Sequence, residues 1–336
     1  MDIGDLEHFR TLLLEREHNL SELVNSKDHL LAKDADKVRE LLVEIKQSLD
    51  RIECGTYGAC DCCDGQVEAF RLEIEPTSRI CLDCLGDTEK AILEEELHVA
   101  GKIYRSLLPE KLESIQGFKI ATQSISAGTI GGDYYDFLPL PDGSGMRVVI
   151  ADMVGKGLPA GLLMSNLQGA LRIFSEDIGK PADLIRRLNQ WLCRNIPMSN
   201  FVTLACFCIE SSDGEESQIT YANAGHWPPV LLRSDGKAEM LEPTGGILGV
   251  HKDFTFEQKD LSMSPGDLLF LYTDGVTESR NDYGEMYEES RLLRFLQEHR
   301  DHSASSLLDK LLQEIWIFRG RSKFDDDLTV IALQKE

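Results

Sequence analysis

The residues of this chain best suited to chemistry are four aspartates that lie beside strand-like apolar runs or glycine-flanked turns. They are Asp133, Asp152, Asp274 and Asp326. Asp152, for example, ends the apolar run Val148–Ala151 and leads into a turn with two glycines, so its carboxylate is expected at the end of a buried strand. Carboxylates that converge from several strand ends offer the oxygen ligands that hard divalent cations prefer.

Such a group of aspartates would repel one another unless cations lay between them or their pKa values rose. Bound metal is the simpler of the two alternatives. Two Mg or Mn ions a few ångströms apart lower the pKa of a bridging water and neutralise phosphoryl oxygens during in-line attack. The chain contains neither the G-x-S-x-G elbow of nucleophilic hydrolases nor a G-x-x-x-x-G-K-[ST] phosphate loop. We therefore expect metal-assisted hydrolysis without a covalent intermediate.

A second set of candidate ligands consists of cysteines, because six of the nine in the chain lie between Cys54 and Cys84. Two C-x-x-C pairs, separated by seventeen residues, have the spacing of a tetrahedral zinc site. The predicted ligands are Cys60, Cys63, Cys81 and Cys84. Four thiolates saturate the ion, so the site should be structural and should supply folding energy to a short segment. Free cysteines packed as small hydrophobic residues are the alternative.

Helices are expected to position the cysteines. Apolar residues recur at three- and four-residue steps across Val38–Ile52, which is the pattern of a helix that packs on a partner helix. Residues 6–24 match this helical pattern less well. We expect a helical hairpin with a charged tip, and a dimerising coiled coil is the alternative.

A third helix is predicted over Thr88–Leu108, and Pro109 ends it. This helix either couples the finger to the following domain or is a passive spacer.

Beyond the third helix, strand patterns alternate with turns, and helical stretches occur in pairs. Strands are expected before Gly157 and again from Phe201, including one over 254–261, whereas helices fill 158–196 and part of the last 50 or so residues. Runs of strands with helices grouped in pairs favour an α+β domain in which two sheets lie between helices.

The composition limits the classes of partner. The chain has 336 residues, with 58 acidic against 35 basic side chains, so its average field repels nucleic-acid backbones and anionic membranes. No apolar run approaches the length of about 20 residues that spans a bilayer, and the N-terminus lacks the features of a secretion signal. These features predict a cytoplasmic protein with no direct nucleic-acid or membrane binding, in which clustered cysteines bind metal.

Five sequence blocks occur in the order GGDYYDF (131–137), DMVGKG (152–157), YANAGH (221–226), YTDGVTE (272–278) and DDLT (326–329). In this order they resemble the catalytic domain of the metal-dependent (PPM) serine/threonine phosphatases, in the bacterial SpoIIE/RsbU branch. The resemblance extends from about Leu97 to the C-terminus and implies an α/β/β/α sandwich. It also implies hydrolysis of phosphoserine or phosphothreonine in a protein, with a phosphorylated anti-sigma-factor antagonist as the substrate.

The same resemblance implies a role for each candidate ligand in a site with two Mn or Mg ions. Asp152 would bridge the ions, and the main-chain carbonyl of Met153 would bind one of them. Asp274 and Asp326 would hold the second ion, while Asp133 would act directly or through water.

Three further features bear on this resemblance. Val154 stands where eukaryotic relatives have a histidine, so this position supplies no general acid, and a metal-bound water is the candidate instead. His226, which precedes Trp-Pro-Pro, is expected to be a packed, hydrogen-bonded turn residue rather than the acid. The predicted helix Thr88–Leu108 resembles the switch-helix linker of this branch, whose movement on partner binding completes the metal site.

Residues 1–86 resemble a second family, the DksA/TraR proteins with a C4 zinc finger. The resemblance rests on the cysteine spacing, on residues 52–60 and 71–77, and on the helical hairpin in front. In that family the hairpin reaches into RNA polymerase, where acidic residues at its tip act, and here Asp34 and Asp36 lie near the corresponding turn. An RNA-polymerase-binding transcription modulator, with a secondary phosphatase domain, is therefore the alternative function.

We predict four parts: a helical hairpin (1–53), a C4 zinc finger (54–86), a helical linker (87–115) and a PPM/SpoIIE-type phosphatase domain (116–336). The expected cofactors are two Mn or Mg ions and one structural Zn. The favoured function is a phosphoprotein phosphatase of bacterial signalling, regulated at its N-terminal region by a protein partner or by RNA polymerase. A homodimer formed through the helices is left open.

Overall fold

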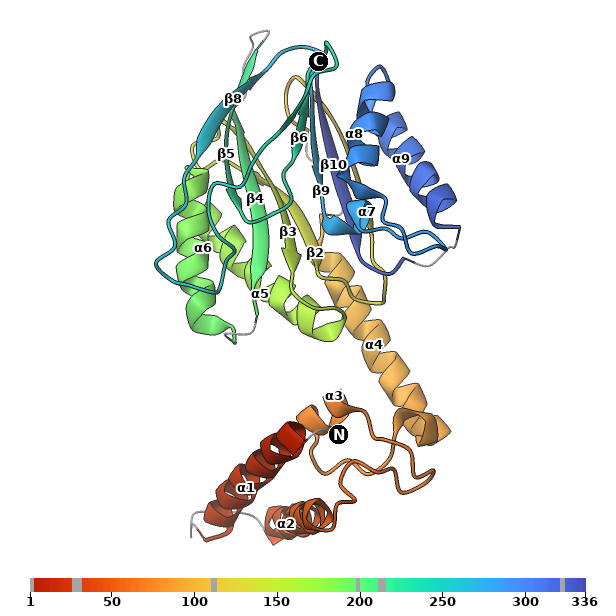
Figure 1. Cartoon of the computed structure of the whole chain (residues 1–336). Helices are drawn as coiled ribbons and strands as arrows, with labels where there is room; N and C mark the ends of the chain where they lie inside the picture. The colour runs from red at the N-terminus through yellow and green to blue at the C-terminus, as the bar shows by residue number, and fades with distance from the viewer. Residues whose placement is uncertain (1–2, 26–31, 110–113, 198–199, 211–215, 321–323) are drawn as a thin grey trace. The chain divides into compact units, whose positions relative to one another are not determined.

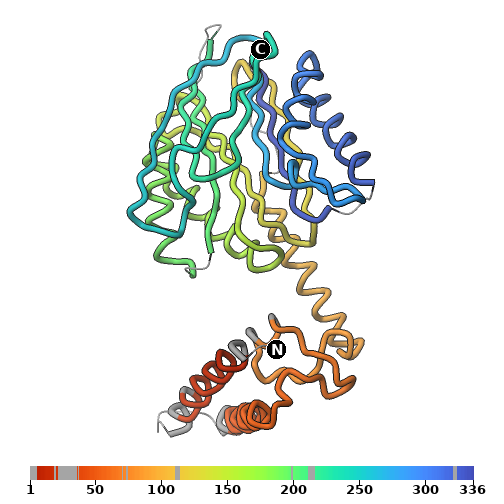
Figure 2. Tube along the Cα trace, viewed as in Figure 1, coloured from red at the N-terminus to blue at the C-terminus, as the bar shows by residue number. Residues whose placement is uncertain are grey.

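The computed structural model describes residues 3–25, 32–109, 114–197, 200–210, 216–320 and 324–336 (Figure 1 and Figure 2). The chain divides into two compact units, Met1–Glu96 and Leu97–Glu336, and helix α4 (Asp87–Leu107) contains the boundary. Within the described ranges, each helix is too short or too polar to cross a membrane.

The first unit consists of two helices and a small cysteine-containing segment. Helices α1 (Ile3–Asn25) and α2 (Ala32–Glu53) pack against each other, and α3 (Ala69–Ile74) and the short 3-10 helix η1 (Leu82–Cys84) follow them. The hairpin and the finger share one hydrophobic core, because side chains from both are buried together. These side chains are Phe9, Leu13, Ile45, Tyr57, Cys60, Val67, Leu72 and Cys81.

The second unit contains two antiparallel sheets, each with five strands among the described residues. The first sheet has the order β1 (Phe118–Ile125), β10 (Leu328–Lys335), β9 (Leu268–Tyr272), β6 (Val230–Leu232) and β7 (Ala238–Met240). The second has the order β2 (Asp133–Pro139), β3 (Gly145–Met153), β4 (Val202–Glu210), β5 (Ser217–Ala224) and β8 (Lys259–Met263).

Helices cover the outer face of each sheet, as Figure 1 shows. Helices α5 (Leu158–Ser175) and α6 (Pro181–Asn195) pack on the second sheet, whereas α8 (Glu288–Glu298) and α9 (Ala304–Arg319) pack on the first. Buried apolar clusters fill the space under each helix pair and the space between the two sheets. The predicted fold class, an α+β protein with an α/β/β/α sandwich, is confirmed.

One predicted strand lies elsewhere. The aromatic and β-branched pattern at 254–261 predicted a strand over that range, but β8 occupies Lys259–Met263. Phe256 instead forms an isolated bridge with Gly245. Its ring packs so closely that a Cβ on Gly245 would lie 2.4 Å from it. A tertiary contact therefore outweighs local strand propensity in the first half of this stretch.

Candidate metal-dependent active site

Neighbouring strands of the second sheet bring two of the candidate ligands together. In the register of β2 and β3, Asp133 lies directly opposite Asp152. On the other side of β3, Thr203 of β4 is the partner of Asp152. Residues directly opposite each other in an antiparallel pair have Cβ atoms about 5 Å apart. The register alone therefore places two carboxylates side by side.

Carboxylates from three separate elements line one pocket of about 490 Å³. Asp152 comes from β3, Asp274 begins the short helix α7 (Asp274–Thr277) directly after β9, and Asp326 precedes β10. Met153 also lines this pocket. Asp133 is not part of the lining but is buried, 2% exposed, on the strand beside Asp152. The fold thus brings residues that are far apart in the sequence to one place.

Burial and mutual repulsion raise the pKa values of these carboxyl groups. Burial, and then the charges of Asp274 and Asp326, raise the pKa of Asp152 to about 7. Burial, and then the charge of Asp326, raise the pKa of Asp274 to about 6. Burial, followed by the charge of Asp152, raises the pKa of Asp133 well above its usual range. Divalent cations would relieve this repulsion, so the donor set fits hard metal ions.

Two threonines that the sequence did not single out orient Asp133. The Thr273 hydroxyl donates to Asp133 Oδ2 at 2.7 Å, and the same hydroxyl oxygen accepts from the main-chain N–H of Thr329 at 2.9 Å. A hydroxyl has one proton, so the N–H of Thr329 leaves that proton directed at Asp133. Both threonines lie close in sequence to predicted ligands, Thr273 before Asp274 and Thr329 after Asp326.

A fifth acid, Asp327, organises the segment that leads into β2. Its carboxylate accepts hydrogen bonds from the main-chain N–H groups of Ala127, at 2.7 Å, and Gly132, at 2.5 Å. This side chain therefore holds the residue that immediately precedes Asp133. Sequence reasoning missed the role, and the only signal was the acidic run 325–327, from which Asp326 alone was chosen as a ligand.

Lys156 carries the one positive charge among the described residues that line the pocket. Its Nζ lies 2.8 Å from Asp326 Oδ2 and donates to the main-chain oxygen of Asp325 at 2.8 Å. The hydrogen bond to Asp326 raises the pKa of Lys156, so its ammonium group stays protonated at neutral pH. The side chain is 60% exposed, so solvent and a ligand in the pocket can reach it.

His226 lines the same pocket but is a neutral, packed side chain. Burial lowers the pKa of His226 to about 4. Its Nδ1 lies 2.9 Å from the Thr203 hydroxyl, and its main-chain N–H donates to Asn223 Oδ1 at 2.8 Å. These contacts agree with the expected hydrogen-bonded turn residue.

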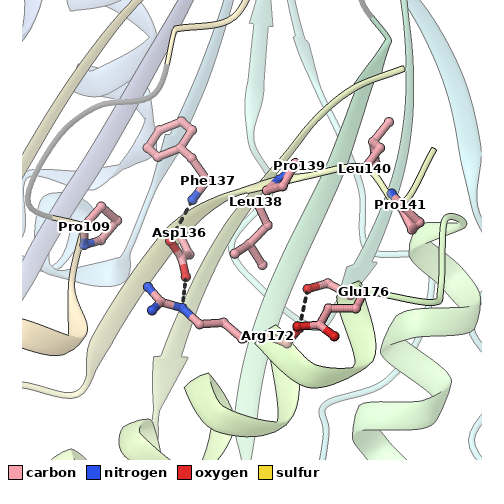
Figure 3. Close-up of a pocket in the computed structure, with 10 residues that line it drawn as sticks. Pro109, Asp136, Phe137, Leu138, Pro139, Leu140, Pro141, Arg172 and Glu176 are labelled. Carbon is pink, nitrogen blue, oxygen red and sulfur yellow. Dashed lines mark hydrogen bonds and ion pairs between the residues drawn. The ribbon is translucent and has the colours of Figure 1, made fainter. Parts of the chain in front are cut away.

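A second pocket, of about 750 Å³, lies between β2 and α5, and none of the described residues lining it is a predicted ligand (Figure 3). Figure 3 shows Asp136 and Arg172 pointing toward each other, with Arg172 Nε 3.0 Å from Asp136 Oδ2. The Tyr134 hydroxyl donates to the same oxygen at 2.6 Å. These contacts tie β2 to α5, and Asp133 is the first residue of β2. We therefore regard this region as support for the site.

The raised pKa values predict an unusual dependence of stability on pH for the ion-free protein. A carboxyl whose pKa is raised on folding keeps its proton in the folded protein at pH values where the unfolded chain releases it. The contribution of this carboxyl to the free energy of unfolding is therefore complete below pH 4 or so and is lost as the pH rises toward about 7, the pKa of Asp152. Asp152→Asn should therefore stabilise the ion-free protein at pH 8 by about 1–2 kcal/mol, which is roughly 4 °C in Tm, and should have little effect at pH 4. Thermal unfolding with a chelator measures this, and an equal effect at both pH values would contradict it.

The predicted cysteine ligands form a tight group in the first unit. The Sγ atoms of Cys60, Cys63, Cys81 and Cys84 all lie within 4.8 Å of one another. Main-chain N–H groups, first that of Cys81 and then that of Cys62, lower the pKa of Cys60 to about 6. Hydrogen bonds from Cys63 and Cys81 raise the pKa of Cys84. The pKa of Cys60 is thus lowered beside Cys84, whose pKa is raised, and a zinc ion would complete this donor set.

The aspartates are spread more widely than the cysteines. Among the described residues, the cysteine group alone brings at least three such ligand atoms within 4.8 Å of one another. Oxygen atoms that bind one Mg ion at about 2.1 Å lie within roughly 4.2 Å of one another. Asp152, Asp274 and Asp326 would therefore have to move closer together to bind the same ion.

The two antiparallel sheets, packed between helix pairs and with carboxylates at their strand ends, form the fold of PP2C domains. The sequence model of one family, described as "Stage II sporulation protein E (SpoIIE)", matches residues 142–336. This match covers more than half of the chain, and the chain belongs to the SpoIIE family.

Two individual proteins and one solved structure are similar to stretches of this chain. "Phosphoserine phosphatase RsbU" of Bacillus subtilis is 29% identical over 245 residues, which cover 73% of this chain and 71% of RsbU. "RNA polymerase-binding transcription factor DksA" of Haemophilus influenzae is 35% identical over 52 residues, which cover 16% of this chain and 36% of DksA. Among solved structures, the SiaA-PP2C domain of Pseudomonas aeruginosa has a TM-score of 0.64 over 75% of this chain and 100% of that one, at 17% identity, which shows a shared fold.

Proposed function

We propose that this protein is a cytoplasmic, Mn- or Mg-dependent phosphatase that removes phosphate from phosphoserine or phosphothreonine in a signalling protein. The convergence of Asp152, Asp274 and Asp326 on one pocket carries the proposal. Membership of the SpoIIE family supports the reaction class, and the relative RsbU supports phosphoserine as the substrate group. The family resemblance further favours a phosphorylated anti-sigma-factor antagonist as the protein substrate.

The residues that would hold the ions are Asp133, Asp152, Asp274 and Asp326, with the main-chain oxygen of Met153. When bound, such ions lower the pKa of a water molecule and neutralise phosphoryl oxygens. Thr273 and Thr329 fix the direction of the Asp133 carboxylate. Neutral His226 keeps the pocket wall uncharged, because its low pKa leaves it unprotonated at pH 7. Lys156 supplies positive charge for the phosphoryl group.

The test is phosphate release from a phosphoserine peptide by the full chain after removal of ions with a chelator. We expect no turnover until Mn²⁺ or Mg²⁺ is added back, because the carboxylates need these ions to act together. Hydrolysis that continues at the same rate in the chelator would contradict a metal-dependent reaction.

Lys156→Met is expected to weaken substrate binding, which raises KM, and to change kcat less. A charge-assisted hydrogen bond contributes about 1.5 kcal/mol or more, so KM for the phosphoserine peptide should rise roughly tenfold. Lys156→Arg keeps the charge and is the matched control. Because Lys156 also contacts Asp326, both variants are compared at saturating Mn²⁺. An unchanged KM for Lys156→Met would show that the ammonium group does not bind the phosphoryl group.

The proposed control through the linker is supported by contacts of α4 within the second unit. The Tyr104 hydroxyl donates to the main-chain oxygen of Asp133 at 3.4 Å. A Cβ on Gly101 would lie 2.7 Å from Thr129 Cγ2, so this turn of the helix packs closely on the segment before β2. A displacement of α4 would therefore be transmitted to Asp133. Tyr104→Phe, which removes the hydroxyl, is therefore expected to lower the affinity for Mn²⁺. An unchanged affinity for Mn²⁺ in this variant would contradict a role for the hydroxyl.

RNA-polymerase binding by the first unit is the second candidate function, and the 52-residue similarity to DksA favours it. Asp36, one of the predicted tip acids, is exposed and pairs with Arg39 at 2.8 Å, whereas the side chain of Asp34 and residues 26–31 lie outside the described residues. Capture of RNA polymerase by the full chain, reduced in Asp36→Ala, would support this function. The proposed homodimer is tested separately by sedimentation.

A further inference from the structure

The strongest feature outside the active site is a buried arginine on β3. Arg147 is 0% exposed, and among the described residues no carboxylate pairs with it. Its guanidinium donates to three main-chain carbonyls at the end of α5 and just beyond it, those of Ser175, Ile178 and Gly179, and its Nε has no hydrogen-bond partner. A buried charge normally has a counter-charge, so an anionic neighbour is expected.

Two thiols on β4 occupy the place of that neighbour. In the register of β3 and β4, Cys208 lies directly opposite Arg147, and Cys206 lies two residues along on the same face of the sheet. Both cysteines are free and buried. A hydrogen bond from Cys206 and the charge of Arg147 lower the pKa of Cys208 against the opposing effects of burial and Glu210, whereas burial raises the pKa of Cys206. The Cys208 thiol donates to the main-chain oxygen of Gly179 at 3.5 Å, and Arg147 donates to the same oxygen at 3.0 Å, so the sulfur lies close to the guanidinium.

Cys208 is also the thiol with a route to solvent. It is 6% exposed, whereas Cys206 is 0% exposed, and it lines a pocket of about 570 Å³. The charged side chains that line this pocket are those of Asp142, Asp177, Lys180, Asp183 and Glu210. No predicted metal ligand is among the described lining residues, so the pocket is separate from the active site.

We propose that Cys208 is a nucleophilic thiol with Arg147 as its charge partner, and that its pocket admits small electrophiles, including hydrogen peroxide, which modify it covalently. With peroxide, the sulfur attacks one oxygen, an S–O bond forms and the O–O bond breaks. The departing hydroxide takes up the proton that the thiol has lost and becomes water. The sulfur is oxidised by two electrons to a sulfenic acid, and the peroxide is reduced.

The test is alkylation of the folded, full chain by limiting iodoacetamide, followed by peptide mass spectrometry. The internal reference is Cys193, whose pKa is raised by burial. At pH 6.5 Cys208 should react at least tenfold or so faster than Cys193, since one pKa unit is a tenfold change in thiolate fraction. Equal or slower labelling of Cys208 would overturn the proposal. Dimedone should trap a sulfenic acid at Cys208 after peroxide treatment.

Three substitutions test whether nearby charges control the reactivity of Cys208. Arg147→Gln should slow labelling of Cys208, and Arg147→Lys should retain most of it. Because a buried position can fail to tolerate replacement, the exposed Glu210→Gln is the second variant: it removes a charge that opposes ionisation and should speed labelling. Rates that are unchanged in folded Arg147→Gln or in Glu210→Gln would contradict an electrostatic origin of the reactivity.

Discussion

Asp152→Asn is expected to lower phosphatase activity by on the order of 10³-fold or more, because the proposed reaction needs bound divalent ions. Asp152 lines the pocket together with Asp274 and Asp326, and its pKa responds to both of their charges. An amide at this position offers one neutral oxygen, so the ions would lose their shared carboxylate. The measurements are phosphate release from a phosphoserine peptide and Mn²⁺ binding by calorimetry. Both should fail together, while the protein remains folded.

Asp142→Asn is the matched control for this substitution. Asp142 is an exposed turn residue between β2 and β3, and its carboxylate accepts from the N–H of Ser144 at 2.9 Å and from the Ser144 hydroxyl at 2.6 Å. An asparagine side-chain oxygen makes the same turn contacts. Activity and Mn²⁺ affinity should therefore match those of the unchanged protein. If Asp152→Asn kept its activity, the two-ion assignment would be wrong, whatever the control did.

The site was predictable to the extent that local sequence reflects burial. Asp152 and Asp274 stood out because apolar runs precede them, and those runs are strands that are covered on both faces. That Asp133 lies opposite Asp152 depends on the register of β2 and β3, which the conformation of the connection 140–144 sets. Their positions beside apolar runs suggested that these residues converge, and the family resemblance supplied the role of each one.

The supporting residues were beyond sequence reasoning, because their roles arise from contacts between distant segments. Asp327 holds Gly132 across 195 positions of sequence, and Thr273 reaches Asp133 across 140. Neither residue differs in type or in local setting from an ordinary strand-end acid or threonine. Arg147 is a similar case, since a lone arginine in a strand reads as an exposed residue until the helices that cover it are known.

The zinc ligands were the most direct prediction, since four cysteines in two C-x-x-C pairs leave few geometric alternatives. Their group joins the core that α1 and α2 share with the finger, because Cys60 and Cys81 pack with Phe9, Leu13 and Ile45. The cysteine spacing predicted the group of four thiols but not this shared core. Loss of the metal is therefore expected to affect the helices as well as the finger.

Cys63→Ser is expected to abolish zinc binding and to unfold the first unit. Structural zinc in small domains contributes on the order of 10 kcal/mol to folding, which exceeds what this small core supplies. Cys63 is an exposed residue whose Sγ lies 3.7 Å from that of Cys81, so the substitution removes a ligand with little loss of packing. Zinc content should fall from about one ion per chain to none, and proteolysis should cut within α1 and α2.

Cys62→Ser separates loss of a ligand from loss of any cysteine. Cys62 is adjacent to Cys63 and also exposed, but its thiol is outside the group of four, and only its main-chain N–H contacts Cys60 Sγ, at 3.4 Å. Serine keeps that N–H, so zinc content and protease resistance should be unchanged. A folded, zinc-free Cys63→Ser protein would show that the thiols pack as small hydrophobic residues. Equal loss of zinc in both variants would show that the ion is bound by a different set of cysteines.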